Sequence, residues 1–297
     1  MKLIESLKSK IKKDGKSLAV PVGVFIFALG FCIMLYPFVG QILNYTQSQK
    51  VIQSFDKAKQ EMPDKEVQRR IRLAQAYNSS LSPGSLYDPF TDKEKYEGRR
   101  EYAKMIEIRE KIGHIKIPKI HEDIPIYAGT SEEVLQKGVG HLEGTSLPIG
   151  GKNTHSVLSA HRGLPTARLF TDLDKLEAND IFYIYNIEKK LAYKVDKISV
   201  VEPTDFSKIN IEKGKDYVTL LTCTPYMINS HRLLVRGHRV SIKEAEREEK
   251  DGHYGLNPYL KRFILLLLLL IASIIFFMKL SKYIEKKRKE SDEVQNK

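Results

Sequence analysis

The sequence predicts a mainly β protein, a closed barrel or a sandwich, carried between two membrane-spanning helices. Three observations support this prediction. Short runs rich in β-branched and aromatic residues follow one another closely from about residue 112 to residue 242. Two long uncharged apolar runs lie toward the two ends of the chain. A polar segment with helical spacing separates the first apolar run from the β-rich region.

The first apolar run covers 18–39 and has 22 uncharged residues, enough at about 1.5 Å per residue to cross a hydrocarbon core of about 30 Å. A cleaved signal peptide is the alternative. However, the run is longer than a typical signal core, and no obvious small-x-small cleavage site follows it. The second run, 263–278, has 16 uncharged residues and relies on Lys261, Arg262 and Lys279 at its ends. We therefore expect an uncleaved anchor and a second span.

The formal net charge of the chain is +12, which by itself would suggest a nucleic-acid partner. However, residues 1–17 carry +4 and residues 279–297 carry +3, so that +5 remains on the rest of the chain. Both basic tails adjoin an apolar run, and basic residues beside a span favour the cytoplasmic side. We expect a membrane protein with both termini in the cytoplasm, its segment 44–262 outside, and no nucleic-acid partner.

Between the apolar runs, the residue pattern changes from one typical of helices to one typical of β-strands. Residues 46–80 predict a helix broken near Met62 and Pro63. Residues 81–92 collect Pro, Gly, Ser and Asp and predict a loop, after which residues 93–111 return to helical spacing. The strand-like runs are 112–120, 123–129, 155–161, 180–186, 190–201, 216–223 and 231–242, and short helical inserts are expected at 132–138 and 165–176.

The two cysteines of the chain, Cys32 in the first apolar run and Cys223 at the end of a strand-like run, offer no disulfide framework. A catalytic thiol needs a base, and it needs a donor for the oxyanion that forms. His161 ends one strand-like run and Arg232 begins another, so these side chains could meet Cys223 if the strands are neighbours. From spacing alone, a small core cysteine remains an alternative. We find no metal-ligand spacing and no phosphate loop, and we expect no metal and no cofactor.

Three segments together resemble the sortases, specifically the class C, pilus-assembling group: TLLTCTPYMINSHRLLVRG, HSVLSAHRGLPTARLFTDLDKL and IPIYAGTSEEVLQKGVGHLEGTSLPIGG. The resemblance implies a closed β-barrel of about eight strands. It also implies that Cys223 is the nucleophile, that His161 is the acid/base and that Arg232 positions the substrate and stabilises the oxyanion. The implied reaction is transpeptidation, in which the thiol cleaves an LPXTG-like sorting motif of a pilin subunit and a Lys amine of the next pilin resolves the thioester.

The resemblance also extends to the loop at 84–92, where Asp88, Pro89 and Phe90 look like the lid of class C sortases and would autoinhibit the enzyme. Two positions depart from the family pattern, since Met227 and Asn179 stand where many relatives have glycine. The expected substrate groove includes Thr222 and Met227, whereas His141, His155 and His231 are expected to be structural. The expected segments are a tail at 1–17, an anchor at 18–43, a helical lead-in at 44–110, a barrel at 111–245, a linker at 246–262, a span at 263–278 and a tail at 279–297.

Three alternatives remain beside the pilus-type sortase. A housekeeping-type sortase would pass the acyl group to a cell-wall precursor, but the lid-like loop and the second apolar run speak against it. A non-catalytic membrane scaffold would keep the barrel and not need Cys223. A papain-like protease is disfavoured because the candidate histidine precedes the cysteine in this chain. The expected partners are therefore pilin subunits, with their sorting signals and acceptor lysines, and the membrane.

Overall fold

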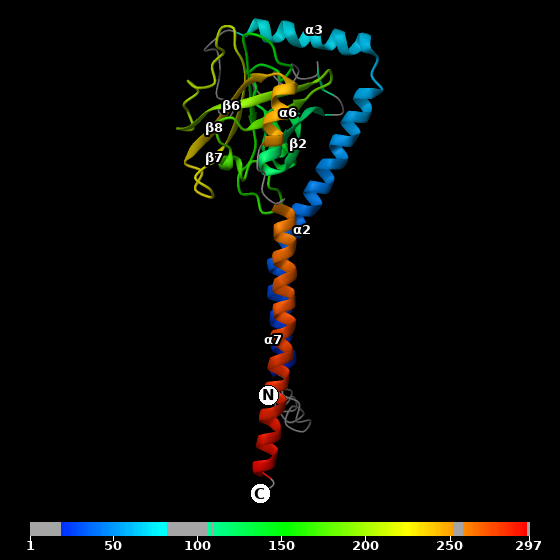
Figure 1. Cartoon of the computed structure of the whole chain (residues 1–297), viewed down its shortest axis with the longest axis vertical. Coiled ribbons are helices and arrows are strands. Elements are labelled where there is room, and N and C mark those ends of the chain that lie inside the picture. Colours follow the sequence, from blue (N-terminus) through cyan, green and yellow to red (C-terminus); the bar gives the residue numbers. More distant parts are fainter. Residues whose placement is uncertain (1–18, 82–105, 108–109, 252–257, 296–297) are drawn as a thin grey trace, which may run out of the picture.

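The computed structural model describes residues 19–81, 106–107, 110–251 and 258–295 (Figure 1). Within these residues, eight strands form a closed barrel in the order β1-β2-β3-β4-β7-β8-β6-β5. The strands are β1 (Lys111–Ile117), β2 (Glu122–Ala128), β3 (Val139–His141), β4 (Thr154–Ser159), β5 (Ile181–Tyr185), β6 (Lys190–Val201), β7 (Asp216–Thr224) and β8 (His231–Val240). The predicted closed barrel is confirmed.

All seven strand-like runs of the sequence form strands, and the structure adds an eighth, β3. This strand has three residues and pairs in parallel with β2 and antiparallel with β4. A run of three residues with a central glycine is too short to show alternation, so its pairing depends on the neighbouring strands. The helical insert at 132–138 is confirmed as α5 (Glu132–Lys137), whereas the one at 165–176 is reduced to a short 3-10 turn, η3 (Leu173–Lys175).

Strand β5 is buried on both faces, because it lies between the barrel interior and a helix on the outside. Phe182 belongs to the main core inside the barrel, where its ring stacks on that of Tyr193 at 5.6 Å between centroids. Tyr183, the next residue, belongs to a second core together with Ala245 of helix α6 (Ile242–Asp251). Residues that alternate along a strand point to opposite faces, so a strand covered on both sides is apolar throughout.

Helix α6 changes the expected role of the segment 246–262. The sequence predicts a linker there, but α6 continues to Asp251 and packs against the barrel. The Tyr183 hydroxyl donates to Glu249 Oε2 at 2.6 Å, and Lys194 Nζ lies 2.9 Å from Glu248 Oε1. The barrel domain therefore includes this helix, which covers the outside of β5 and β6.

Two helices precede the barrel. Helix α2 (Ala19–Gln60) runs without a break from the first apolar run into the polar lead-in, and α3 (Asp64–Ser80) follows after the predicted break at Met62 and Pro63. The upper part of α2 packs on the barrel, with Asp56 Oδ1 3.7 Å from His114 Nε2 of β1. Helix α3 then crosses the end of the barrel that lies farthest from α7 (Figure 1).

Helix α7 (Pro258–Gln295) lies beside the lower part of α2, where the rings of Phe27 and Phe277 meet edge to face at 4.8 Å (Figure 1). Both helices are long and apolar enough to cross a membrane, within Phe25–Gln60 and Leu260–Leu280. Near the barrel they are joined by a hydrogen bond from Arg262 of α7 to Gln41 of α2. The barrel is thus held at one end of a two-helix stalk.

Candidate active site

The strand order brings the three residues singled out in the sequence to one rim of the barrel. Strand β7 pairs antiparallel with β8, and Cys223 stands opposite Arg232 in this register. Strand β4 pairs in parallel with the other edge of β7, with Ser159 opposite Leu221. His161 follows Ser159 by two residues, as Cys223 follows Leu221, so the histidine lies at the same level of the rim as the cysteine.

Cys223 is half-buried at this rim, and Arg232 is held beside it by the backbone of the preceding turn. Nη1 of Arg232 donates to the carbonyl oxygens of Asn229 and His231, both at 3.2 Å. These bonds hold the guanidinium at the start of β8. Among the residues that the structure describes, no acidic side chain pairs with it. A guanidinium is permanently charged and presents a fork of donors, so Arg232 can donate hydrogen bonds to a carbonyl or an oxyanion at the rim.

His161 has a carboxylate partner that the sequence analysis missed. Its Nε2 lies 3.1 Å from Oε1 and 3.2 Å from Oε2 of Glu132, the first residue of α5. The amide of Gln136 and the ring of His161 both lower the pKa of Glu132. Ser131 caps α5 by accepting a hydrogen bond from Val134 N at 3.4 Å, which fixes where Glu132 begins the helix. No spacing in the sequence links Glu132 to a histidine 29 residues later, because the contact depends on the barrel.

The loop after His161 is fastened by a network of buried charges. Arg168 is only 3% exposed and lies 2.9 Å from Glu122 Oε1, and it also pairs with Asp172. Nearer the rim, Arg162 Nη1 donates to the hydroxyl of Thr224 at 3.0 Å, next to Cys223. The backbone nitrogen of Phe170 donates back to His161 O at 3.2 Å. The loop is therefore a fixed support for the histidine.

The two residues expected at a substrate groove have different positions. Thr222 is fully buried, and its hydroxyl donates to Ala160 O at 2.8 Å, so this side chain joins β7 to β4 and cannot line an open groove. Met227 is 69% exposed in the turn between β7 and β8. Met227 and Asn179, the two departures from glycine, have φ of 65° and 77°, a region that favours glycine and admits Asn more readily than Met.

The structural roles expected for His141 and His155 agree with their burial, since their side chains bond within the barrel. His141 Nε2 donates to Ser146 O at 2.8 Å, and His155 Nδ1 donates to Asn210 O at 2.9 Å. Burial lowers the pKa of both rings, and that of His141 to about 4. His231 differs, because it is half-exposed at the surface with Nε2 3.2 Å from Glu202 Oε1.

These two buried rings predict a loss of stability in acid. The ordinary pKa of a histidine is 6.5 and that of His141 in the fold is about 4, so the unfolded chain binds more protons between these values. The free energy of unfolding should therefore fall as the pH drops, by roughly 3 kcal/mol for His141 between about pH 7 and about pH 4. Chemical unfolding at the two pH values measures this loss, and His141→Gln, which keeps an amide donor for Ser146 O, should reduce it. An equal loss of unfolding free energy in the variant would show that His141 is not its source.

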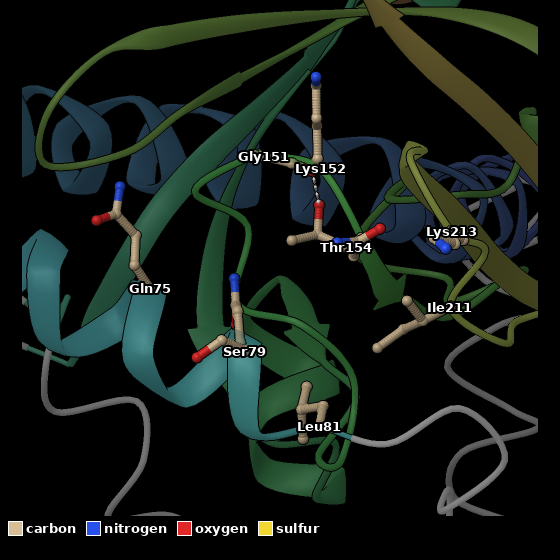
Figure 2. A pocket seen from close by; sticks show the side chains of 11 residues that line it. Gln75, Ser79, Leu81, Gly151, Lys152, Thr154, Ile211 and Lys213 are labelled. Atoms are coloured by element: carbon tan, nitrogen blue, oxygen red, sulfur yellow. Dashed lines mark hydrogen bonds between the residues drawn. The ribbon is translucent and has the colours of Figure 1, made fainter.

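The residues assigned to a lid, Asp88, Pro89 and Phe90, lie outside the described residues. A cavity of about 520 Å³ lies elsewhere, between the end of α3 and the loop at 150–154 (Figure 2). Figure 2 shows Gln75 and Ser79 on one side of it and Lys152 and Thr154 on the other. Thr154 begins β4 opposite Asp216 at the start of β7, so this cavity is at the opposite end of these strands from Cys223.

A thiol, an imidazole and a guanidinium gathered at one rim of a closed barrel are the groups that a cysteine-dependent acyl-transfer enzyme needs. Comparison with known proteins identifies the family. Residues 115–240 match the family model described as Sortase domain. The crystal structure of Streptococcus pneumoniae Sortase C is 55% identical, with a TM-score of 0.60, over 65% of this chain and 97% of that one. The chain therefore belongs to the sortase family of transpeptidases.

Two further comparisons cover different parts of the family. Group B Streptococcus Pilus Island 1 Sortase C2 is 64% identical, with a TM-score of 0.57, over 61% of this chain and all of that one. Sortase A of Bacillus anthracis is 30% identical over 132 residues. That match covers 44% of this chain and 61% of the length of the Bacillus protein. The higher identity to the sortases C extends over more of the chain than the likeness to Sortase A.

Proposed function

We propose that this sortase is a class C transpeptidase that joins pilin subunits into a covalent pilus. The observation that carries the proposal is the likeness, at 55–64% identity, to two sortases C: that of Streptococcus pneumoniae, whose structure concerns pilin substrate specificity, and Sortase C2 of Pilus Island 1 of Group B Streptococcus. The substrates would be pilins with an LPXTG-like sorting motif and the acceptor a Lys amine of the next pilin. The matches to sortases A, at 24–31% identity, favour a housekeeping role less.

In the proposed reaction, the thiolate of Cys223 attacks the carbonyl carbon of the motif's Thr, and Arg232 donates hydrogen bonds to the resulting oxyanion. His161 then gives a proton to the departing Gly amine, and the Thr–Gly bond breaks to leave a thioester on Cys223. A Lys amine attacks this thioester, His161 accepts the proton that the amine releases, and the thiolate leaves. The product is an isopeptide bond between two subunits, and the enzyme returns to its starting state.

The acceptor distinguishes the pilus role from cell-wall attachment. We would incubate the enzyme with an LPXTG peptide and offer, in separate reactions, a pilin that carries acceptor lysines and an oligopeptide amine that mimics a cell-wall precursor. The proposal expects the pilin to be joined to the peptide through a lysine at a higher rate than the precursor mimic. A preference for the precursor mimic would favour the housekeeping role.

Glu132 is proposed to hold the ring of His161 in the orientation that proton transfer requires. Because Glu132 is 68% exposed, solvent weakens the pair, and about 1 kcal/mol or about a fivefold loss of kcat/KM is expected for Glu132→Gln. Steady-state kinetics with an LPXTG peptide would measure this loss.

Glu133→Gln supplies a matched control for this prediction. Glu133 is the next residue of α5, is 79% exposed, and pairs with Lys137 at 2.7 Å. Its replacement removes the same charge from the same helix and should leave kcat/KM close to that of the unmodified enzyme. A similar loss of kcat/KM in both variants would show a general charge effect of α5, and the positioning role of Glu132 would be wrong.

The two apolar helices support a membrane arrangement in which both spans are retained. We propose that both termini are cytoplasmic and that the barrel faces outward, because basic residues flank each span on the side away from the barrel. Protease added to intact protoplasts should then digest the barrel and spare a tag at either terminus. Digestion of a terminal tag under these conditions would contradict the arrangement.

A further inference from the structure

An unusual group of exposed apolar side chains lies beside the candidate active site. Outside α2 and α7, six large apolar side chains are exposed among the described residues: Leu73, Ile198, Val200, Tyr226, Met227 and Ile228. The last three are consecutive in the turn between β7 and β8, and they are 50%, 69% and 71% exposed. We call this turn the apolar tip. Contiguous exposed apolar groups mark surfaces that contact a protein or a membrane.

The backbone of the turn keeps these side chains directed outward. The backbone nitrogens of Ile228 and Asn229 both donate to Pro225 O, at 3.1 and 3.0 Å, which closes the turn. Met227 and Asn229 have positive φ values of 65° and 62°. Non-glycine residues rarely adopt this conformation, so a defined turn and not a collapsed loop presents Met227 and Ile228 to the surroundings.

A chain of contacts joins the apolar tip to the end of the first candidate span. The ring of Tyr226 lies over Gly163, where a Cβ atom would be 3.0 Å from the ring. Three residues later, Thr166 lies against Gly40 of α2, where a Cβ atom would be 3.0 Å from the Thr166 methyl group. Both glycines thus permit close approaches. The loop from Gly163 to Thr166 therefore connects the tip to α2.

Side-chain hydrogen bonds strengthen this connection at the point where both candidate spans reach the barrel. Gln41 Nε2 of α2 donates to Pro165 O at 3.0 Å, and Arg262 of α7 donates to Gln41. In Figure 1, the turn that follows β7 points down, toward the level where α7 begins, whereas α3 covers the opposite end of the barrel. The apolar tip is thus on the side of the barrel from which the spans leave.

We propose that the apolar tip rests in the lipid interface beside the protein's own two spans. Tyrosine suits this position because its ring is apolar and its hydroxyl can remain among the headgroups, while Met227 and Ile228 would reach the upper part of the acyl chains. The rim that carries Cys223 is then held at the membrane surface. A pilin that is still anchored in the same membrane can present its sorting motif there, and this consequence rests on the function proposed above.

The sequence contains no tryptophan, so single tryptophans can report the depth of chosen sites. We would place the full chain in vesicles that contain brominated lipids, which quench tryptophan on contact, and compare three variants. Ile228→Trp reports the apolar tip. Leu267→Trp reports the second candidate span, and Leu73→Trp, on an exposed site of α3 at the far end of the barrel, serves as the matched aqueous control. Retained thioester formation with a sorting peptide verifies that each variant is folded.

The expected result for Ile228→Trp is a loss of tryptophan emission that is greater for lipids brominated near the headgroups than for lipids brominated near the chain ends. The Leu267→Trp variant should show the reverse order, and the Leu73→Trp variant should lose little emission with either lipid.

Emission of the Ile228→Trp variant that is as insensitive to brominated lipid as that of the Leu73→Trp control would overturn the proposal. If a sorting peptide then changed the emission of this variant, the apolar tip would be a surface that docks substrate, and the membrane proposal would still be overturned. If the emission of the Leu267→Trp variant were also unquenched, α7 would not lie in the membrane. The proposal, which depends on the two spans, would then be wrong. Failed thioester formation in the unmodified enzyme would concern only the proposed function.

Discussion

Cys223→Ala should lose transpeptidation, with a rate of isopeptide formation roughly 10³-fold or more below that of the unmodified enzyme. The reason is chemical, since alanine has no nucleophile and no thioester can form, and water or another side chain at the rim cannot replace the thiol. His161 and Arg232 would remain in place at the rim. The measurement is the rate at which an LPXTG peptide becomes joined to a pilin that carries acceptor lysines.

The second cysteine of the chain provides the control for this experiment. Cys32 is exposed on α2 within the first candidate span, eight residues before Gly40, where α2 meets the barrel. Cys32→Ala removes a thiol without touching the rim and should keep the full rate. Substantial polymerisation by Cys223→Ala would support the scaffold alternative, in which the barrel is kept for binding alone.

Arg168→Met should lower the free energy of unfolding by about 3–5 kcal/mol, because it removes the positive charge that lies against the buried carboxylate of Glu122. Arg168 and Glu122 are only 3% and 5% exposed, and their atoms lie 2.9 Å apart. Methionine fills a similar volume, so the loss reports the charge more than the packing. Chemical unfolding of the full chain measures the change.

An exposed ion pair in the same loop serves as the comparison. Lys175 Nζ lies 2.9 Å from Asp172 Oδ1, but its side chain is 63% exposed. Lys175→Met should therefore cost less than about 1 kcal/mol, because solvent screens the pair. Equal losses in the two variants would show that burial of the Arg168 charge is not what fastens the loop after His161.

The rim could be predicted from the sequence because its three residues lie at the ends of strand-like runs. Cys223 ends one run, His161 ends another, and Arg232 begins a third. The sequence did not show which of these strands are adjacent in the sheet. The strand order β4-β7-β8 shows that the three strands are neighbours. The close likeness of the motifs to the sortases indicated the same residues independently of this geometry.

Other parts of the molecule depended on contacts between distant segments. Glu132 meets His161 only because α5 leads into β3, a strand too short for its periodicity to be seen. The segment 165–176 has helical spacing, but Arg168 forms a buried ion pair with Glu122 of β2. The segment forms only the short turn η3 in place of the predicted helix. Tertiary contacts of this kind override local propensity. For the same reason, Thr222 is a buried link between strands and not part of a groove wall.

The most direct test of the account is intact-mass spectrometry of the unmodified enzyme after incubation with an LPXTG peptide and no acceptor amine. We expect a species heavier by the acyl fragment that ends at the motif's Thr, mapped to Cys223 by peptide digestion and lost when a pilin lysine is added. Release of the cleaved peptide without any adduct, or an adduct on a residue other than Cys223, would contradict the proposed thioester mechanism.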